Sequence, residues 1–373
     1  MVKGDAGSSL AAATIVLDLD TIEGNTRRLA KHLPGLDLVG VTKVTCGEPA
    51  VGRAMLRGGA TALADSRPAN LARLRAAGIT APLWLLRAPA PAQADEVVQL
   101  ADISLESELV TVRALDAAAG ARSLVHSVVC MVDLGDLREG VLPGDLLPFV
   151  EQVAALRHVR VAGIGVNLTC YGAIVPSEEN LGELVRLAAD VEDLLGRPIV
   201  VSGGNSGSLD LALSGRLPGG VTSLRVGETI LLGLDTLTRE PLARLRQDAF
   251  VLKAPIIECL VKPSLPRGES AQDAFGNRPV YQDRGDRRRA ILALGRQDAY
   301  PDLLTPVDRR VEVLGASSDH LIVDVEAVAP PPQVGDVVEL IPGYGSVLQA
   351  FTSPYVEKEI RGGPDASTGT GGR

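Results

Sequence analysis

Residues 38–64 have the sequence LVGVTKVTCGEPAVGRAMLRGGATALA, in which a strand, a helix and a second strand follow one another. Residues 38–42 are apolar or β-branched, as in a buried strand, whereas residues 48–57 place apolar side chains at helical spacing and end at two glycines. Residues 62–64 return to the short apolar pattern of a strand. Because the connection is a helix, the two strands are expected to run parallel in one sheet.

The same unit recurs on both sides of this stretch. Further strands are expected at residues 14–19, 83–86, 103–105, 127–132, 161–166, 199–202 and 223–226, and further helices at residues 21–33, 67–77, 107–119, 146–156 and 177–195. Eight or nine such units in about 220 residues fit a (β/α)₈ barrel of the TIM type better than an open sheet, although periodicity alone leaves the open sheet as an alternative.

After Leu234 the pattern changes. Residues 250–261, 289–294, 310–314, 320–325 and 337–341 read as strands, and turn-forming sequences such as KPSLPRG, QDRGD and PPPQVGD separate them, with little helical pattern. This predicts a C-terminal antiparallel β domain. We expect the barrel to occupy residues 14–240 and the β domain residues 241–358, with a disordered leader at 1–13 and a disordered tail at 359–373.

The composition excludes several classes of protein. The chain has 373 residues, of which 46% are apolar and 22% charged, as in a globular protein. The net charge of −9, with no basic block, argues against a nucleic-acid partner. No apolar run reaches the roughly 18 residues that a membrane span needs, and the N-terminus lacks a signal-peptide core. Four scattered cysteines indicate reduced thiols, so a cytoplasmic protein is expected.

Lysine is scarce: the chain has six lysines among its 37 basic residues, which leaves 31 arginines. Lys43 is the one that directly follows a predicted barrel strand, where active sites of such barrels lie. A desolvated lysine can lose its proton and act as a nucleophile or form a Schiff base, which arginine cannot do. The alternative is an ordinary strand-end lysine that reaches solvent or pairs with a carboxylate. The bias towards arginine favours the catalytic interpretation.

Other polar residues follow the later strands and would face the same mouth: Arg138 in DLGDLREG, Asn167 in NLTCY, Ser206 in SGGNSGS, and Arg225, Gly227 and Glu228 in LRVGET. The two Gly-rich turns could be ordinary strand–helix turns, but two on neighbouring strands favour a phosphate cradle. Arg225 would be either a buried ion pair or a donor to a cofactor ring or anion. Arg138 could pair with Asp133, Asp136 or Glu139 as a plain loop network.

Histidine and metal chemistry receive little support. His32 and His158 read as surface residues, His126 precedes a strand, and only His320, in GASSDH, adjoins other polar residues. No Ser-His-Asp arrangement and no Cys/His ligand spacing occurs, so no metal site is predicted.

Several motifs together resemble the fold-type III pyridoxal-phosphate (PLP) enzymes, the alanine racemase superfamily, and within it the ornithine racemase-like branch. They are GVTKVTCGEP, ADSRPANL, MVDLGDLREG, NLTCYGAIVPSEENL, SGGNSGSL, LRVGETILLG, KPSLPRGE, DAFGN, RAILALGRQD and LGASSDHL. The resemblance covers about residues 14–358. It implies a PLP-dependent amino acid racemase that works through an external aldimine and Cα proton transfer, in a homodimer with shared active sites.

The resemblance also implies roles for single residues. Lys43 stands where the family has the lysine that joins the cofactor covalently, and Arg225 matches the arginine on the pyridine nitrogen, a weak proton donor that limits side reactions. The remaining matches are Arg138 near the phenolic oxygen, Asn167 where alanine racemases have histidine, and Ser206, the backbone of Gly227 and Glu228, and Tyr355 at the phosphate.

One departure concerns the second base. The family's tyrosine position falls at Phe275, which has no proton to exchange, so another group must serve. The candidates are Asp273, Tyr281, Ser318, Asp319 and His320. Ser318 and Asp319 also fall where related decarboxylases carry a Cys-Asp pair that meets the distal amine of a basic substrate. By that analogy the substrate is ornithine or another basic amino acid.

Alternative functions on the same scaffold are an alanine or broad-specificity racemase, a decarboxylase and an aldolase. Arg225 argues against a decarboxylase, where the family has an acidic residue on the ring nitrogen, and the lack of a metal pair argues against metal-dependent aldolases. A non-catalytic PLP-handling protein is the rival from another class. Such proteins are typically a barrel without a β domain, so residues 250–358 favour an enzyme.

Overall fold

The computed structural model describes residues 10–364, which form two compact units. One unit runs from Leu19 to Gln247. The other combines the described residues up to Asp18 with those from Asp248 onward. The predicted boundary falls between residues 240 and 241, whereas this second change of unit falls between Gln247 and Asp248. The expected leader and tail fall partly on residues 1–9 and 365–373, which lie outside the described part of the chain.

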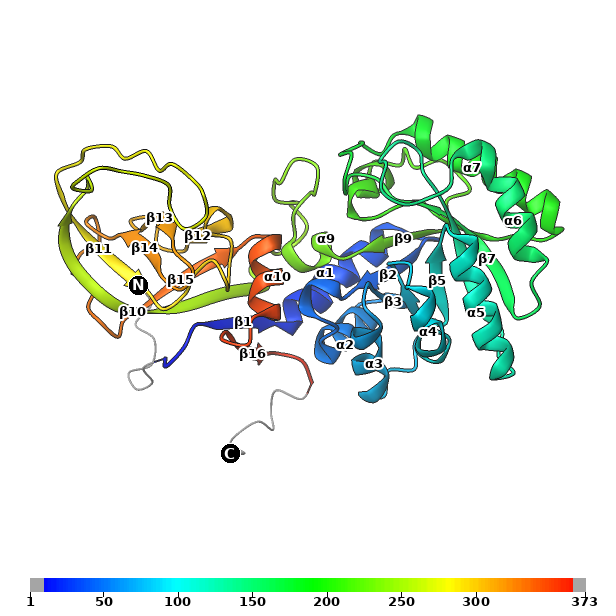
Figure 1. The fold of residues 1–373 in the computed structure, drawn as a ribbon, viewed down its shortest axis with the longest axis horizontal. Coiled ribbons are helices and arrows are strands. Elements are labelled where there is room, and N and C mark those ends of the chain that lie inside the picture. Colours follow the sequence, from blue (N-terminus) through cyan, green and yellow to red (C-terminus); the bar gives the residue numbers. More distant parts are fainter. Residues whose placement is uncertain (1–9, 365–373) are drawn as a thin grey trace. The chain divides into compact units, whose positions relative to one another are not determined.

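The first unit is a closed barrel of eight parallel strands with helices around it (Figure 1). The fold class expected from the sequence is therefore confirmed. The barrel strands are β2 (Asp37–Val41), β3 (Ala62–Asp65), β4 (Leu83–Leu85), β5 (Ile103–Glu106), β6 (His126–Val132), β7 (Val159–Val166), β8 (Val200–Ser202) and β9 (Ser223–Val226). The helices are α1 (Leu19–His32), α2 (Pro49–Arg57), α3 (Pro68–Ala76), α4 (Ala94–Leu100), α5 (Leu109–Ala121), α6 (Leu146–Ala154), α7 (Glu178–Leu195), α8 (Leu209–Leu213) and α9 (Glu228–Leu232).

Large and small side chains fill the barrel interior, as expected for a packed core rather than a pore. Alternate residues of the strands form one buried cluster, made of Val39, Val41, Ala62, Ala64, Trp84, Leu105, Val129 and Met131. Arg225 pairs in register with Val39, so it points to this inner face as well. The strand residues between these positions point outward, to the helices.

Two titratable side chains are buried on the outward face. Glu106, which follows the inward-facing Leu105, is fully buried, and neither of its oxygens accepts a hydrogen bond within the described residues. Burial raises the pKa of this carboxyl to about 8. Burial has the opposite effect on the pKa of His126, lowering it to about 4, and its Nε2 atom lies 2.9 Å from the Ser104 hydroxyl. Both groups are therefore neutral in the folded chain near neutral pH.

Glu106→Gln should remove a pH dependence of stability. The pKa of the Glu106 carboxyl is about 8 in the folded chain, against an ordinary value of 4.5 that applies to the unfolded chain. Between these two pH values the folded chain therefore keeps a proton on Glu106 that the unfolded chain has lost. The free energy of unfolding of the wild type should thus fall by on the order of 3–5 kcal/mol as the pH rises through this window. Urea unfolding at about pH 5 and about pH 8 should show the variant matching the wild type at the lower pH and exceeding it at the higher. The control is Glu96→Gln, which changes an exposed carboxyl. If the free energy of unfolding of Glu106→Gln fell with pH as much as that of the wild type, the raised pKa of Glu106 would be contradicted.

The second unit is an eight-stranded sheet that is antiparallel except for one parallel pair. Its strands are β1 (Thr14–Asp18), β10 (Phe250–Pro263), β11 (Asp286–Leu292), β12 (Leu304–Pro306), β13 (Glu312–Ala316), β14 (Leu321–Asp324), β15 (Val337–Pro342) and β16 (Glu357–Arg361). The prediction that residues 14–19 begin the barrel is wrong, because β1 pairs with β10 and β16 (Figure 1). Its apolar, β-branched sequence suits either environment, and only long-range pairing decides between them.

Two further differences concern the end of the chain. A helix, α10 (Tyr344–Thr352), begins directly after β15 and Gly343, although little helix was expected in this half. Residues Glu359 to Arg361, which were assigned to the disordered tail, continue β16 beside β1. The four cysteines form no disulfide. None of the described helices combines the length and apolar character required to span a membrane.

Candidate active site

The structure places the seven barrel residues predicted from the sequence at the C-terminal end of the barrel strands. In a closed parallel barrel these strand ends form a single rim, so residues distant in sequence meet there. They are Lys43 after β2, Arg138 after β6, Asn167 after β7, Ser206 after β8, Arg225 within β9, and Gly227 and Glu228 after β9.

Lys43 opens a single 3₁₀ turn, Lys43–Thr45, directly after β2. The side chain is half-buried, and the turn ends at Cys46 in the left-handed conformation, with φ 52°. The turn after β9 touches the same strand end, because a Cβ on Gly227 would lie 2.9 Å from the Val41 Cβ atom. The positive charge of Lys43 also lowers the pKa of Glu228, although burial raises that pKa on balance. Lys43 and the turn after β9 thus face each other.

Arg225 is only 4% exposed and is held by two hydrogen bonds. Its Nη1 atom donates to the Ser202 hydroxyl and its Nη2 atom to the Val166 carbonyl, the latter at 2.7 Å. Burial lowers the pKa of the guanidinium to about 10, so the group remains charged at neutral pH. The Nε atom has no protein hydrogen-bond acceptor among the described residues. A charged donor is therefore left over at the inner face of the rim.

Asn167 is the second buried donor at the rim. Its Oδ1 atom accepts a hydrogen bond from Asn205 Nδ2 at 3.2 Å, and Asn205 also binds the Leu168 carbonyl at 2.7 Å. The Asn167 Nδ2 atom is buried and has no partner among the described residues. A buried amide donor without an acceptor is unfavourable by about 1–3 kcal/mol, which points to a ligand that completes it.

Arg138 lies in a tightly closed loop after β6. Both Nε and Nη2 of its guanidinium donate to the carboxylate of Glu139. Of the three possible partners named from the sequence, Arg138 therefore pairs with Glu139. Asp136, which is 1% exposed, instead accepts hydrogen bonds from the backbone NH groups of Cys170 and Tyr171, at 3.3 and 3.1 Å. Asp136 thereby fastens the loop of Arg138 to the loop of Asn167.

The two Gly-rich turns lie next to each other. The Ser206 hydroxyl, in the 3₁₀ turn Ser206–Ser208, accepts a long hydrogen bond of 3.4 Å from the Thr229 NH group in α9. The side chain of Glu228 forms an ion pair with Arg239, which leaves the backbone of Gly227 and Glu228 as the part facing the rim. Small residues, hydroxyls and NH groups in this arrangement can bind a phosphate.

The remaining four predicted residues belong to the sheet unit, which is described by itself. Asp319 Oδ1 accepts a hydrogen bond from Gln297 at 2.7 Å, and Oδ2 accepts one from the Ser318 hydroxyl at 2.8 Å. His320 Nδ1 lies 3.4 Å from the Ser317 hydroxyl. Tyr355 is 67% exposed. Ser318, Asp319 and His320 thus form one exposed turn, and Tyr355 belongs to a different segment of the unit, which follows α10.

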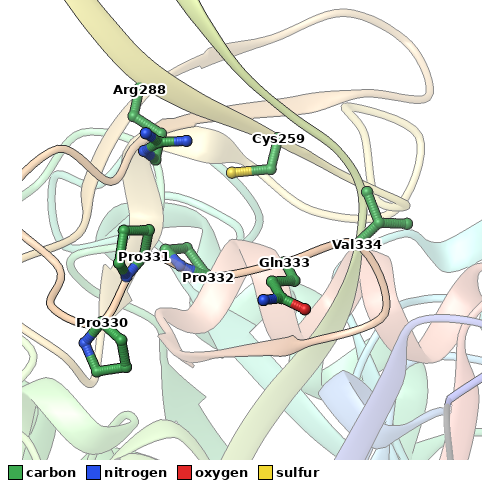
Figure 2. Close-up of a pocket in the computed structure, with 7 residues that line it drawn as sticks. All are labelled: Cys259, Arg288, Pro330, Pro331, Pro332, Gln333 and Val334. Atoms are coloured by element: carbon green, nitrogen blue, oxygen red, sulfur yellow. The ribbon is translucent and has the colours of Figure 1, made fainter.

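The sheet unit also contains a hollow of about 480 Å³. Figure 2 shows Cys259 and Arg288 projecting from neighbouring strands, opposite the run of residues from Pro330 to Val334. No residue predicted for the active site lines it. Within residues 10–364, no three His, Cys, Asp or Glu side chains are grouped as a metal site would require.

Sequence reasoning missed the polar groups behind the rim. These are Thr42, Asp65 and Asn70, which form a network next to Lys43 in which Thr42 and Asp65 are fully buried. The signal was present, because the motif ADSRPANL places an aspartate at the end of a predicted strand. Nothing local to that motif indicates that its partner lies beside the lysine.

Comparisons with known proteins identify the family of the chain. The family described as "Alanine racemase, N-terminal domain" matches residues 17–234. The chain is 48% identical to an ornithine racemase from Acetoanaerobium sticklandii over 299 residues, which cover 80% of this chain and 84% of that one. It is 38% identical to a lysine racemase from Thermotoga maritima over 347 residues, covering 92% and 97% of the two chains.

Solved structures of alanine racemases have a similar fold. The crystal structure of an alanine racemase from the D-cycloserine producer Streptomyces lavendulae superimposes with a TM-score of 0.74 at 20% identity, covering 97% of this chain and all of the other. An alanine racemase from Bartonella henselae, solved with covalently bound pyridoxal phosphate, has a TM-score of 0.70 at 17% identity over 94% of this chain and all of that one. The family match spans more than half of the chain, and the chain therefore belongs to the alanine racemase family.

Proposed function

We propose that the protein is a PLP-dependent amino acid racemase that interconverts the L and D enantiomers of ornithine or another basic amino acid. It is an isomerase. The similarity to an ornithine racemase over four fifths of the chain carries this proposal, and a second relative acts on lysine, also a basic amino acid. The arrangement of Lys43, Arg225 and the two Gly-rich turns around one barrel rim supports it.

The residues present fit pyridoxal phosphate. The buried Asn167 Nδ2 atom lacks an acceptor, and the Arg225 Nε atom is a second donor at the rim. A cofactor with a phenolic oxygen and a pyridine nitrogen supplies acceptors for such donors. Arg138 and Asn167 would bind the oxygen, Arg225 the ring nitrogen, and Ser206 with the backbone of Gly227 and Glu228 the phosphate. Tyr355 is proposed as a further phosphate ligand.

When bound, pyridoxal phosphate withdraws electrons from the substrate Cα atom and makes its proton acidic. Lys43 would hold the cofactor covalently, and its amine would exchange a proton with the substrate Cα atom from one face. Arg225, with a pKa of about 10, keeps its own proton and donates a hydrogen bond without transferring it. Asp136 and Asn205 keep the loops that carry Arg138 and Asn167 in place.

Racemisation requires a proton donor on the face of Cα opposite Lys43. Phe275 cannot serve, and its ring instead lies 4.8 Å below the Arg296 guanidinium. We assign the second proton transfer to the turn of Ser318, Asp319 and His320. Among these three residues, His320 carries an imidazole, the side chain that most often transfers protons in enzymes.

A screen of amino acids tests the substrate assignment. Loss of optical rotation should be followed with L-ornithine, L-lysine, L-arginine and L-alanine. We expect ornithine or lysine to have the highest kcat/KM. Racemisation of alanine alone would reject a basic substrate, and racemisation of none would reject the racemase itself.

Asp319→Asn should weaken recognition of the distal ammonium of the substrate. The variant keeps the shape and the hydrogen bond from Gln297 but loses the negative charge. We expect KM for ornithine to rise about tenfold, the size of one lost charge-assisted hydrogen bond. Norvaline, which has the carbon chain of ornithine without the amine, should show no such rise. Asp302→Asn on the exposed surface is the control, and an equal loss with both substrates would remove Asp319 from this role.

We also propose a cytoplasmic homodimer with shared active sites, which produces D-amino acids. The four free cysteines suit a reducing compartment. Exposed apolar side chains on the sheet unit support assembly, since Phe275, Val280 and Tyr281 are 47%, 96% and 48% exposed. Sedimentation equilibrium tests the dimer. A monomer with full activity would contradict shared sites.

A further inference from the structure

We propose that Asp65 is a positioning residue for Lys43: its buried carboxylate fixes both ends of the turn that carries the lysine. The inference deepens the proposed function, since it matters for catalysis only if Lys43 binds the cofactor. Asp65 belongs to the motif ADSRPANL, which none of the roles assigned above explains.

The carboxylate of Asp65 is fully buried and fully used. It is the last residue of β3, and it accepts three hydrogen bonds. Oδ2 binds the Thr42 hydroxyl at 2.9 Å, and Oδ1 binds the Asn70 side chain at 2.8 Å and the Arg67 NH group at 3.2 Å. All three donors come from protein, so the network is complete without a ligand.

Thr42 transmits this restraint to the start of the turn, because it directly precedes Lys43. Its NH group donates to the Ala64 carbonyl at 2.9 Å, so both backbone and side chain tie it to β3. Its carbonyl in turn accepts the NH groups of Thr45 and Gly47, at 3.0 and 3.3 Å, and the Thr45 hydroxyl at 2.9 Å. The position of Thr42 therefore sets the path of the chain around Lys43.

Asn70 restrains the end of the same turn. Gly47 has φ 64°, and a Cβ at this position would lie 2.8 Å from the Cβ and carbonyl oxygen of Asn70. The backbone of Asn70 thus packs directly against Gly47, and only glycine fits both the left-handed conformation and the close approach. Because Asp65 binds both Thr42 and Asn70, a single carboxylate holds the two ends of residues 42–47.

Asp65 cannot itself be a catalytic residue. Its neighbour Ala64 belongs to the cluster inside the barrel, so the side chain of Asp65 points outward, to the helix side. Burial raises its pKa, and its hydrogen bonds oppose that rise. A group on the far side of the strand acts on the reaction only through Lys43. Restraint of a reacting group matters, because small displacements cost large factors in rate.

Matched substitutions test the proposal in the full-length chain. Thr42→Val removes the hydroxyl with little change in shape, Thr42→Ser keeps it, and Asp65→Asn converts an acceptor of the network into a donor. Ser104→Ala is the control, because it removes another buried hydrogen bond of the barrel, that to His126, away from Lys43. Amide hydrogen exchange should be measured with and without pyridoxal phosphate, together with the visible absorption per bound phosphate and kcat.

We expect Thr42→Val and Asp65→Asn to speed exchange at the NH groups of Thr45, Cys46 and Gly47 by about tenfold. In these variants a smaller share of the bound cofactor should be joined to Lys43, and kcat should fall about ten- to a hundredfold. Thr42→Ser and Ser104→Ala should leave the exchange of these amides and the covalent share as in the wild type.

The proposal is overturned if Thr42→Val exchanges like Thr42→Ser at these amides, or if Ser104→Ala speeds them equally. Should Asp65→Asn not fold, the two threonine variants alone decide. Absence of racemase activity in the wild type would reject the proposed function instead. The exchange result needs no substrate, so the two failures are distinguishable.

Discussion

Lys43→Ala should abolish racemisation, lowering kcat by about 10⁴-fold or more, because covalent catalysis and proton transfer at Cα are lost together. The purified variant should also lack the visible absorption of a cofactor joined to a lysine. Lys43→Arg tests whether the positive charge alone is sufficient, since arginine keeps this charge but does not release its proton near neutral pH. We expect it to be as inactive as the alanine variant.

The control for this prediction is Lys31→Ala, in the last turn of α1, where the side chain is exposed. It should retain full activity and absorption. Lysine-bound absorption that persists in Lys43→Ala would show that another lysine binds the cofactor. The proposed covalent and proton-transfer roles of Lys43 would then have to be abandoned.

Arg225→Lys should give the second-largest loss. One ammonium cannot replace a planar guanidinium that binds the Ser202 hydroxyl and the Val166 carbonyl and still presents its Nε atom. We expect kcat/KM to fall by about 10²–10³-fold, and the free energy of unfolding by about 1–3 kcal/mol, as buried acceptors lose their partner. Steady-state kinetics and thermal unfolding measure the two effects.

Arg122→Lys is the matched control, since Arg122 forms an exposed ion pair with Asp95. Exposed pairs contribute about 0–1 kcal/mol, so neither activity nor stability should change appreciably. If Arg225→Lys lost stability but kept its kcat/KM, Arg225 would be a structural ion of the barrel without a role at the ring nitrogen.

Much of the barrel and of its rim could be predicted from sequence, for one physical reason. In a parallel barrel, chemistry gathers at the strand ends, and a strand end is visible locally as the first polar residue after an apolar run. Lys43, Asn167 and the turn of Gly227 were found in this way. The match to Tyr355 depended on resemblance alone, since this residue lies in a loop without such a signal.

The remainder depended on contacts between distant segments. Nothing in the sequence of β1 distinguishes a barrel strand from a strand of the antiparallel sheet, and its partners start more than 200 residues later. The network of Asp65 was missed for the same reason, because its carboxylate points away from the rim to which strand-end reasoning directs attention. The second base was left open because the family's tyrosine is replaced by Phe275, and pattern matching cannot say which group takes over.

The pairing of β1 with β16 bears on how the chain is made. Thr14 lies opposite Glu357, so the two partners are 343 positions apart in the chain (357 − 14) and are synthesised at very different times. The barrel, from Leu19 to Gln247, closes its own ring of hydrogen-bonded strands and is complete well before β16 emerges. Until then β1 has no parallel partner and keeps an open edge. Although β1 precedes all the other described strands in the chain, it is therefore among the last to be fully paired, and a chain that stops before Glu357 leaves that edge open permanently.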